Sequence, residues 1–122
     1  MKKSKAKKSK RKLLEAQIEK LWILRIRERD QVCRHCGSTE VLQCHHIRSR
    51  RHSATKYDLT NGILLCRRFH FLQKANPADF YPAVIDIIGQ DKYNMLKQKS
   101  MVDKKWSVQE LELIKIKLGG DE

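Results

Sequence analysis

The sequence predicts an α+β fold in which a small strand–loop–strand–helix unit is flanked by helices on both sides. Two short apolar runs, residues 41–47 and 63–65, have the length and composition of strands and lie on either side of a basic loop. The chain of 122 residues suits one small domain with tails. We expect four segments: a disordered basic arm (1–12), an N-terminal amphipathic helix (13–30), a central module (31–75) and a helical extension (76–122).

Net charge and cysteine content already indicate the class of partner and the use of the cysteines, before any motif is considered. The formal net charge of +13 indicates a polyanionic partner, and nucleic acid is the expected one. Of the four cysteines, two form a close pair among histidines, and no secretory signal precedes them. This favours metal binding in a reducing cytoplasm over a disulfide framework. No stretch is apolar enough to span a membrane, so we expect no membrane partner.

The first thirty residues change character near Leu13. Residues 1–12 are nearly all Lys, Ser and Arg, which cannot be buried, so we expect an arm without regular structure. Two interpretations stay open for it: contact with phosphates or a solvated tail that aids solubility. Beyond it, apolar residues recur at helical spacing and predict one buried stripe. This stripe consists of Leu14, Ile18, Leu21, Trp22 and Ile26.

Cysteines and histidines dominate the central module. Cys33 and Cys36 are separated by two residues, so both thiolates can reach one zinc ion, but the pair is only half a site. His45 and His46 are consecutive in an expected strand and must point to opposite faces, which makes two different roles available.

Downstream of the histidine pair, a basic loop is followed by a turn, a second strand and a helix. The loop residues Arg48, Arg50, Arg51 and Lys56 concentrate positive charge where a phosphate would bind. Residues 58–62, which include Asn61, have turn chemistry, and the helix is expected to start near Cys66. Cys66 and His70, four residues apart, then share one helix face.

The extension after Ala75 predicts three further helices. We place an N-cap at Asp79 so that Pro82 falls in the first helical turn, where its missing N–H costs least. A short helix is expected over 91–98. The last helix begins with a capping box at Ser107 and runs to Leu118.

Taken together, these motifs resemble the HNH endonucleases of the ββα-metal class, and in particular small phage-encoded, NinG-like members. The resemblance covers roughly residues 25–100. It rests on an ordered set of residues rather than on any single one. The set comprises Cys33 and Cys36, the segment Leu42–Ile47, Ser49–Arg51, Ala54–Asp58, Asn61–Cys66 and His70.

The resemblance implies a metal-dependent nuclease that cuts or nicks DNA. His46 would be the general base that activates a water molecule. His45 and His70 would bind one divalent cation, which is Mg²⁺, Mn²⁺, Zn²⁺ or Ni²⁺. Asn61 would either fix the loop between the strands or reach that metal. Arg48 or Arg50 would clamp the phosphate.

The resemblance also implies a structural zinc on Cys33, Cys36 and Cys66, but Phe69 stands where relatives have a further ligand. Cys44, His70 and His35 are the alternatives for the fourth position, with Cys44 favoured as a packing residue. Loss of the zinc, with Phe69 filling the space, is a further alternative.

A non-catalytic zinc-knuckle module that binds nucleic acid is therefore the second hypothesis. If the chain is phage-encoded, it would act in the host cytoplasm. Proteins of phage packaging or recombination are then candidate partners besides DNA, and the sequence leaves the oligomeric state undetermined.

Overall fold

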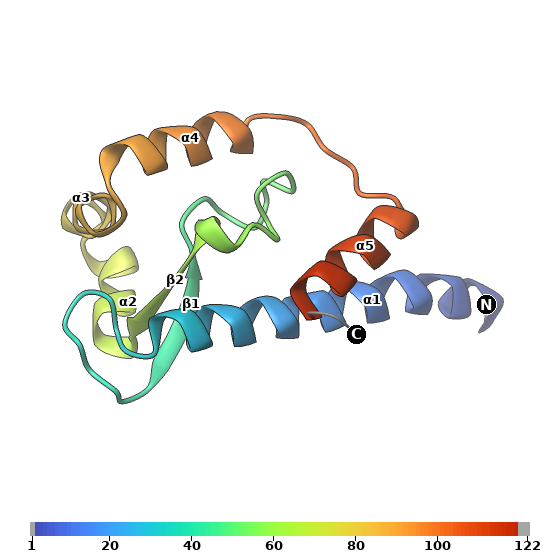
Figure 1. Cartoon of the computed structure of the whole chain (residues 1–122), viewed down its shortest axis with the longest axis horizontal. Helices are drawn as coiled ribbons and strands as arrows, with labels where there is room; N and C mark the ends of the chain where they lie inside the picture. The colour runs from blue at the N-terminus through green and yellow to red at the C-terminus, as the bar shows by residue number, and fades with distance from the viewer. Residues whose placement is uncertain (1, 120–122) are drawn as a thin grey trace.

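The computed structural model describes residues 2–119 and the side chains of residues 10–119. The elements follow in the order α1 (Lys2–Asp30), β1 (Leu42–His46), a 3-10 turn η1 (Leu59–Asn61), β2 (Gly62–Cys66), α2 (Arg67–Ala75), α3 (Pro77–Ile88), α4 (Gln90–Ser100) and α5 (Val108–Gly119). This arrangement confirms the predicted α+β class, with a ββα core between an N-terminal helix and a helical extension (Figure 1).

The two strands form an antiparallel hairpin whose register places the functional residues. His45 pairs with Ile63, and His46 pairs with Gly62. Residues directly opposite one another share a face of the sheet, so His45 and His46 lie on opposite faces, as predicted. β2 is buried along its whole length because helices cover both faces of the hairpin.

Two clusters of buried apolar side chains pack the helices against the two faces of the hairpin. On one face, α1 packs against β2 and α5 packs against α1, with a shared cluster of Leu14, Ile18, Trp22, Ile26, Tyr57, Leu64, Leu111 and Leu118. On the other, α2, α3 and α4 surround a cluster of Cys33, Ile47, Ile63, Leu65, Cys66, Phe69, Phe80, Val84 and Leu96. The hairpin is therefore the middle layer of the molecule, and each histidine of the pair faces a different cluster.

The α1 stripe is confirmed, and it explains the glycine after Asn61. A Cβ atom at Gly62 would lie 2.0 Å from Ile26 Cδ1 and 2.6 Å from Trp22 Cζ2. Gly62 has an extended backbone with φ of −118°. Glycine is therefore needed here because α1 approaches the backbone closely, not because the turn has an unusual conformation.

The start of α1 differs from the sequence prediction. The helix begins at Lys2, so residues 2–12 are helical where an arm without regular structure was expected. Lys, Arg and Ala are good helix formers, and the segment contains no glycine or proline. Because packing of Leu14 and Ile18 already anchors the helix, extending it by further turns carries no new nucleation cost.

The start of α3 also differs. The helix begins at Pro77 with Asn76 as N-cap, not at Asp79, and Pro82 lies inside it. Pro77 at the first helical position needs no N–H partner. Asn76 Nδ2 donates to Asp79 Oδ2 at 2.7 Å, which ties Asp79 into the first turn instead of the cap.

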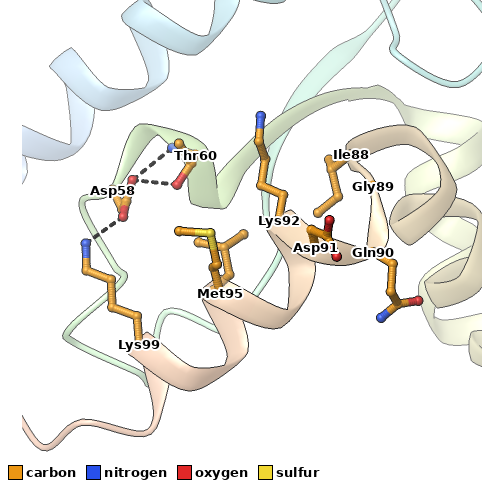
Figure 2. A pocket seen from close by; sticks show the side chains of 10 residues that line it. Asp58, Thr60, Ile88, Gly89, Gln90, Asp91, Lys92, Met95 and Lys99 are labelled. Atoms are coloured by element: carbon orange, nitrogen blue, oxygen red, sulfur yellow. Dashed lines mark hydrogen bonds and ion pairs between the residues drawn. The ribbon is translucent and has the colours of Figure 1, made fainter.

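α4 is fastened to the loop between the strands by an ion pair. Lys99 Nζ lies 2.7 Å from Asp58 Oδ2, while Asp58 Oδ1 accepts from the Thr60 hydroxyl and backbone N–H (Figure 2). Asp58 thus caps η1 and holds α4 with the same carboxylate.

Within the described residues, no helix is long and apolar enough to cross a membrane.

Candidate metal centres and nucleic-acid contacts

His45 and His70 meet between β1 and α2. Nδ1 of His45 lies 3.2 Å from Nε2 of His70. Two nitrogens that share a tetrahedral ion at about 2.0–2.1 Å are about 3.3 Å apart. The separation therefore fits a common metal ion, and the residues are brought together from positions 25 apart in the sequence.

The surroundings of His45 keep its imidazole neutral. The side chain is 6% exposed and packs edge-on against Phe80, with ring centroids 5.2 Å apart. Burial, with smaller contributions from the charges of His70 and His46, lowers the pKa of His45 to about 4. Burial also lowers the pKa of His70. Neutral imidazoles are the form that binds metal ions.

One nitrogen of His45 stays unsatisfied. Among the described side chains, Nε2 of His45 is the buried polar atom without a hydrogen-bond partner. Such a group costs about 1–3 kcal/mol. The fold keeps an imidazole at this buried position despite that cost, which is typical of a residue retained for its chemistry rather than for packing.

His46 lies on the other face of β1, against α1. Its ring stacks on Trp22 with centroids 4.1 Å apart and an interplanar angle of 7°. With Glu19, Trp22, Lys56 and Tyr57 it lines a cavity of about 10 Å³, which is close to the space that one water molecule needs. The structure thus joins His45 to His70 but does not place His46 with them.

A backbone carbonyl sets the tautomer of His46. Nε2 of His46 lies 3.1 Å from the Lys56 carbonyl oxygen, so the proton resides on Nε2 and the N–H donates. Nδ1 then carries the basic lone pair. Burial lowers the pKa of His46, although the Lys56 carbonyl acts in the opposite direction. His46 is therefore neutral at pH 7, and Nδ1 is the ring nitrogen that can accept a proton.

Asn61 fixes the loop between the strands. Its Oδ1 accepts from the Arg48 N–H at 2.7 Å, and its Nδ2 donates to the carbonyls of Arg48 and Thr55 at 3.0 and 3.1 Å. The residue is fully buried. Of the two roles predicted for Asn61, the geometry supports loop fixation, and Asn61 is not retained as a metal ligand.

Arg48 differs from the expected phosphate clamp. Its guanidinium donates to Ser100 Oγ at 3.0 Å and to the Tyr93 hydroxyl at 3.2 Å. Arg48 thereby joins the loop to α4. No sequence pattern signals this contact, because Tyr93 and Ser100 lie in a helix whose docking position only the tertiary structure defines.

The remaining basic residues of the loop are more accessible to a phosphate than Arg48 is. Arg51 is exposed, and Arg50 is exposed but pairs with Glu19 at 3.3 Å. Lys56 is half-buried, with Nζ 5.4 Å from the centre of the Tyr57 ring. Both Arg50 and Lys56 lie on the His46 side of the molecule. Arg50 pairs with Glu19, which lines the small cavity beside His46, and the Lys56 carbonyl contacts His46 itself.

Cys33, Cys36 and Cys66 gather at a second candidate metal centre. Their sulfur atoms all lie within 4.8 Å of one another, and Sγ of Cys36 is 3.7 Å from Sγ of Cys66. Two thiolates bound to one tetrahedral zinc ion at about 2.3 Å are about 3.8 Å apart. The donor set fits zinc, so a Cys cluster positioned for metal binding is confirmed.

The alternatives for a fourth protein ligand are not realised at this cluster. Cys44 donates its thiol to the Ile23 carbonyl and packs beside α1. His70 is held by His45. His35 stacks on the buried Phe69, with centroids 3.8 Å apart and 5° between the rings. Among the described residues, the cluster contains three ligands.

Comparison with known proteins agrees with this geometry. Residues 33–70 match the model of a family described as HNH endonuclease. The matched segment begins at Cys33 and ends at His70, so it contains both candidate metal centres. It supports a nuclease or another nucleic-acid-related function. No curated protein and no solved structure matched the chain.

Proposed function

We propose that the protein is an HNH-type endonuclease that hydrolyses DNA phosphodiester bonds with one divalent cation held by His45 and His70. The observation that carries this proposal is the 3.2 Å separation of Nδ1 of His45 and Nε2 of His70. Two protein ligands leave coordination positions open for water and phosphate oxygens, and a catalytic ion needs at least one open position. When bound, such an ion polarises the phosphate and stabilises the leaving oxygen.

The ligands favour some ions over others. Imidazole suits Zn²⁺, Ni²⁺ and related transition ions, whereas Mg²⁺ prefers carboxylates and water. Among the described residues, no carboxylate joins His45 and His70 in a group of three metal ligands. We therefore expect Ni²⁺ or Zn²⁺ to support cleavage better than Mg²⁺.

In this proposal His46 removes a proton from the attacking water through Nδ1. The Lys56 carbonyl fixes the tautomer, and Trp22 fixes the ring plane. His45 and His46 are adjacent but leave β1 on opposite faces. A phosphodiester that meets both therefore has to lie across the end of β1, where Arg50, Arg51 and Lys56 offer positive charge.

The wider setting follows from the same residues. The ordered motif supports a small phage-type, NinG-like protein with DNA as its partner, and proteins of phage packaging or recombination as possible further partners. All four cysteines are free, which fits a reducing cytoplasm.

Plasmid nicking tests the proposal. We expect the parent to nick supercoiled DNA with Mn²⁺, Ni²⁺ or Zn²⁺. His70→Ala should lose both nicking and binding of the ion, measured by calorimetry. His46→Ala should lose nicking by about 10²–10⁴-fold but keep the ion. Equal nicking by the parent and His46→Ala would exclude His46 as the base.

A second candidate function is nucleic-acid binding without catalysis. The placement of His46 against Trp22, on the face opposite to His45 and His70, favours it. This candidate predicts binding that weakens steeply with salt and no cleavage with any of these ions. Cleavage by the parent that His70→Ala abolishes would eliminate it.

A further inference from the structure

We propose that zinc at Cys33, Cys36 and Cys66 keeps an exchangeable fourth position that binds a small thiolate from solution. The inference rests on the proposed binding of zinc and is independent of nuclease activity. It turns a centre expected to be purely structural into a ligand-binding site.

The three sulfurs lie close enough together to bind one metal ion. They lie within 4.8 Å of one another, and the 3.7 Å between Cys36 and Cys66 matches two thiolates on one zinc ion. Cys33 and Cys66 are buried, whereas Cys36 is exposed. The cluster therefore sits at the surface, with solvent reaching one of its ligands.

No protein donor fills the fourth position. Phe69, where a fourth ligand would stand in the motif, is buried and apolar, and its backbone N–H donates to Cys66 Sγ at 3.4 Å. Its ring holds His35 by stacking. Among the described residues, His35 and Glu40 place no donor atom within the range that unites the three sulfurs. Zinc with three protein ligands takes its fourth from solvent.

A cavity opens beside the cluster to admit that ligand. It has a volume of about 810 Å³ and is lined by Cys36, Cys66, His35, Glu40, Phe69 and the arginines at the start of α2, among others. Two of the three zinc ligands thus face the same open space. A small molecule can approach the metal from this side without displacing the core.

Softness favours a thiolate in the fourth position, and two arginines beside the cluster offset its charge. Three thiolates around Zn²⁺ leave one net negative charge, and a fourth thiolate raises it to two. Arg67 and Arg68 are exposed, line the cavity and can offset this charge. Soft sulfur ligands suit zinc better than phosphate oxygens do.

Cobalt substitution provides the test, because sulfur-to-cobalt charge-transfer absorption reports bound thiolates, and a cobalt ion at His45 and His70 has no cysteine ligand. The full chain is loaded with Co²⁺ under a phosphine reductant and titrated with 2-mercaptoethanol. We expect the band to rise saturably by about one third as three thiolates become four. Inorganic phosphate should leave it unchanged. No response to the thiol would overturn the proposal.

Three variants sharpen the result. Phe69→Cys supplies a fourth protein thiolate, so its band should start about one third higher and show no response to the thiol. His35→Ala and Glu40→Gln should behave like the parent. If either of them changes the spectrum before any thiol is added, that residue is the fourth ligand and the position is closed. Because no DNA is present, failure of the nuclease proposal would not affect these readings.

Discussion

The imidazole of His46 lies almost parallel to the indole of Trp22, and the two rings belong to elements far apart in the sequence. Trp22 is part of α1, outside the segment 33–70 that matches the HNH family model. The indole Nε1 also donates to the Asp58 carbonyl at 3.0 Å, which holds the ring in place. A helix beyond the matched motif therefore determines the orientation of the proposed base.

Replacing Trp22 should impair cleavage without affecting ion binding. Trp22→Leu removes the flat surface under His46, and we expect nicking to fall by about 10–100-fold. Trp22→Phe keeps an aromatic ring and should stay within a few-fold of the parent. The rate of plasmid nicking and the calorimetric affinity for Mn²⁺ are the measurements. Equal rates in the two folded variants would show that the stack does not position His46.

Gly62→Ala should destabilise the protein through contacts with α1. The added methyl group would meet Ile26 Cδ1 at 2.0 Å and the Trp22 ring at 2.6 Å. Such overpacking costs about 1–3 kcal/mol, measured as a shift in urea unfolding. Ile26→Val removes the nearest clashing atom, so the double variant should recover part of the loss. Strict additivity of the two changes would refute this account.

Asn61→Ala should loosen the loop while leaving ion binding intact. The change removes three hydrogen bonds and leaves backbone groups of Arg48 and Thr55 unpaired, which costs about 3 kcal/mol. We expect faster amide exchange at Arg48 and an unchanged Mn²⁺ affinity in the variant, at a temperature where it stays folded. A fall in that affinity of tenfold or more would instead identify Asn61 as a ligand.

Asp30 should make stability depend on pH in acid. Burial alone would raise its pKa, but hydrogen bonds from Arg29 and the Leu64 N–H, with the charges of Arg29 and Arg34, lower the pKa overall. A carboxyl group with a lowered folded pKa contributes stability above its unfolded pKa of about 3.9 and loses it as pH falls further. Unfolding by urea at pH 7 and pH 3 should differ more in the parent than in Asp30→Asn.

Substitution of Arg48 should lower stability, whereas substitution of Arg51 should weaken DNA binding. Arg48 bonds to Ser100 and Tyr93, so Arg48→Ala should lower the urea midpoint. Arg51 is exposed, and Arg51→Ala should reduce the slope of log affinity against log salt by about 1 without changing stability. The opposite assignment would place the phosphate contact at Arg48.

The sequence predicted those features that local chemistry decides. Alternation along a strand separates His45 from His46, and Ser107 with Glu110 forms the expected capping box. Each of these features depends on a few neighbouring residues. The prediction that Cys66 and His70 share one helix face is wrong, because Cys66 ends β2 as the extended N-cap of α2 and lies beside Cys36, whereas His70 lies beside His45.

Features that depend on docking between distant elements were not predictable. The sequence showed a basic Arg48 beside the histidines, but α4 brings Tyr93 and Ser100 to its guanidinium. The turn pattern explained Asn61-Gly62 by conformation, whereas the position of α1 makes any larger side chain clash there. In both cases the decisive partner lies more than 30 residues away in the sequence.

The layering of the hairpin between α1 and the later helices has a consequence for engineering. Residues 33–70, transplanted alone onto another scaffold, would carry all the histidines and cysteines of both centres. They would lack Trp22, which stacks on His46, and Phe80, which packs edge-on against His45. The smallest transferable segment that keeps both contacts therefore extends at least from Trp22 to Phe80.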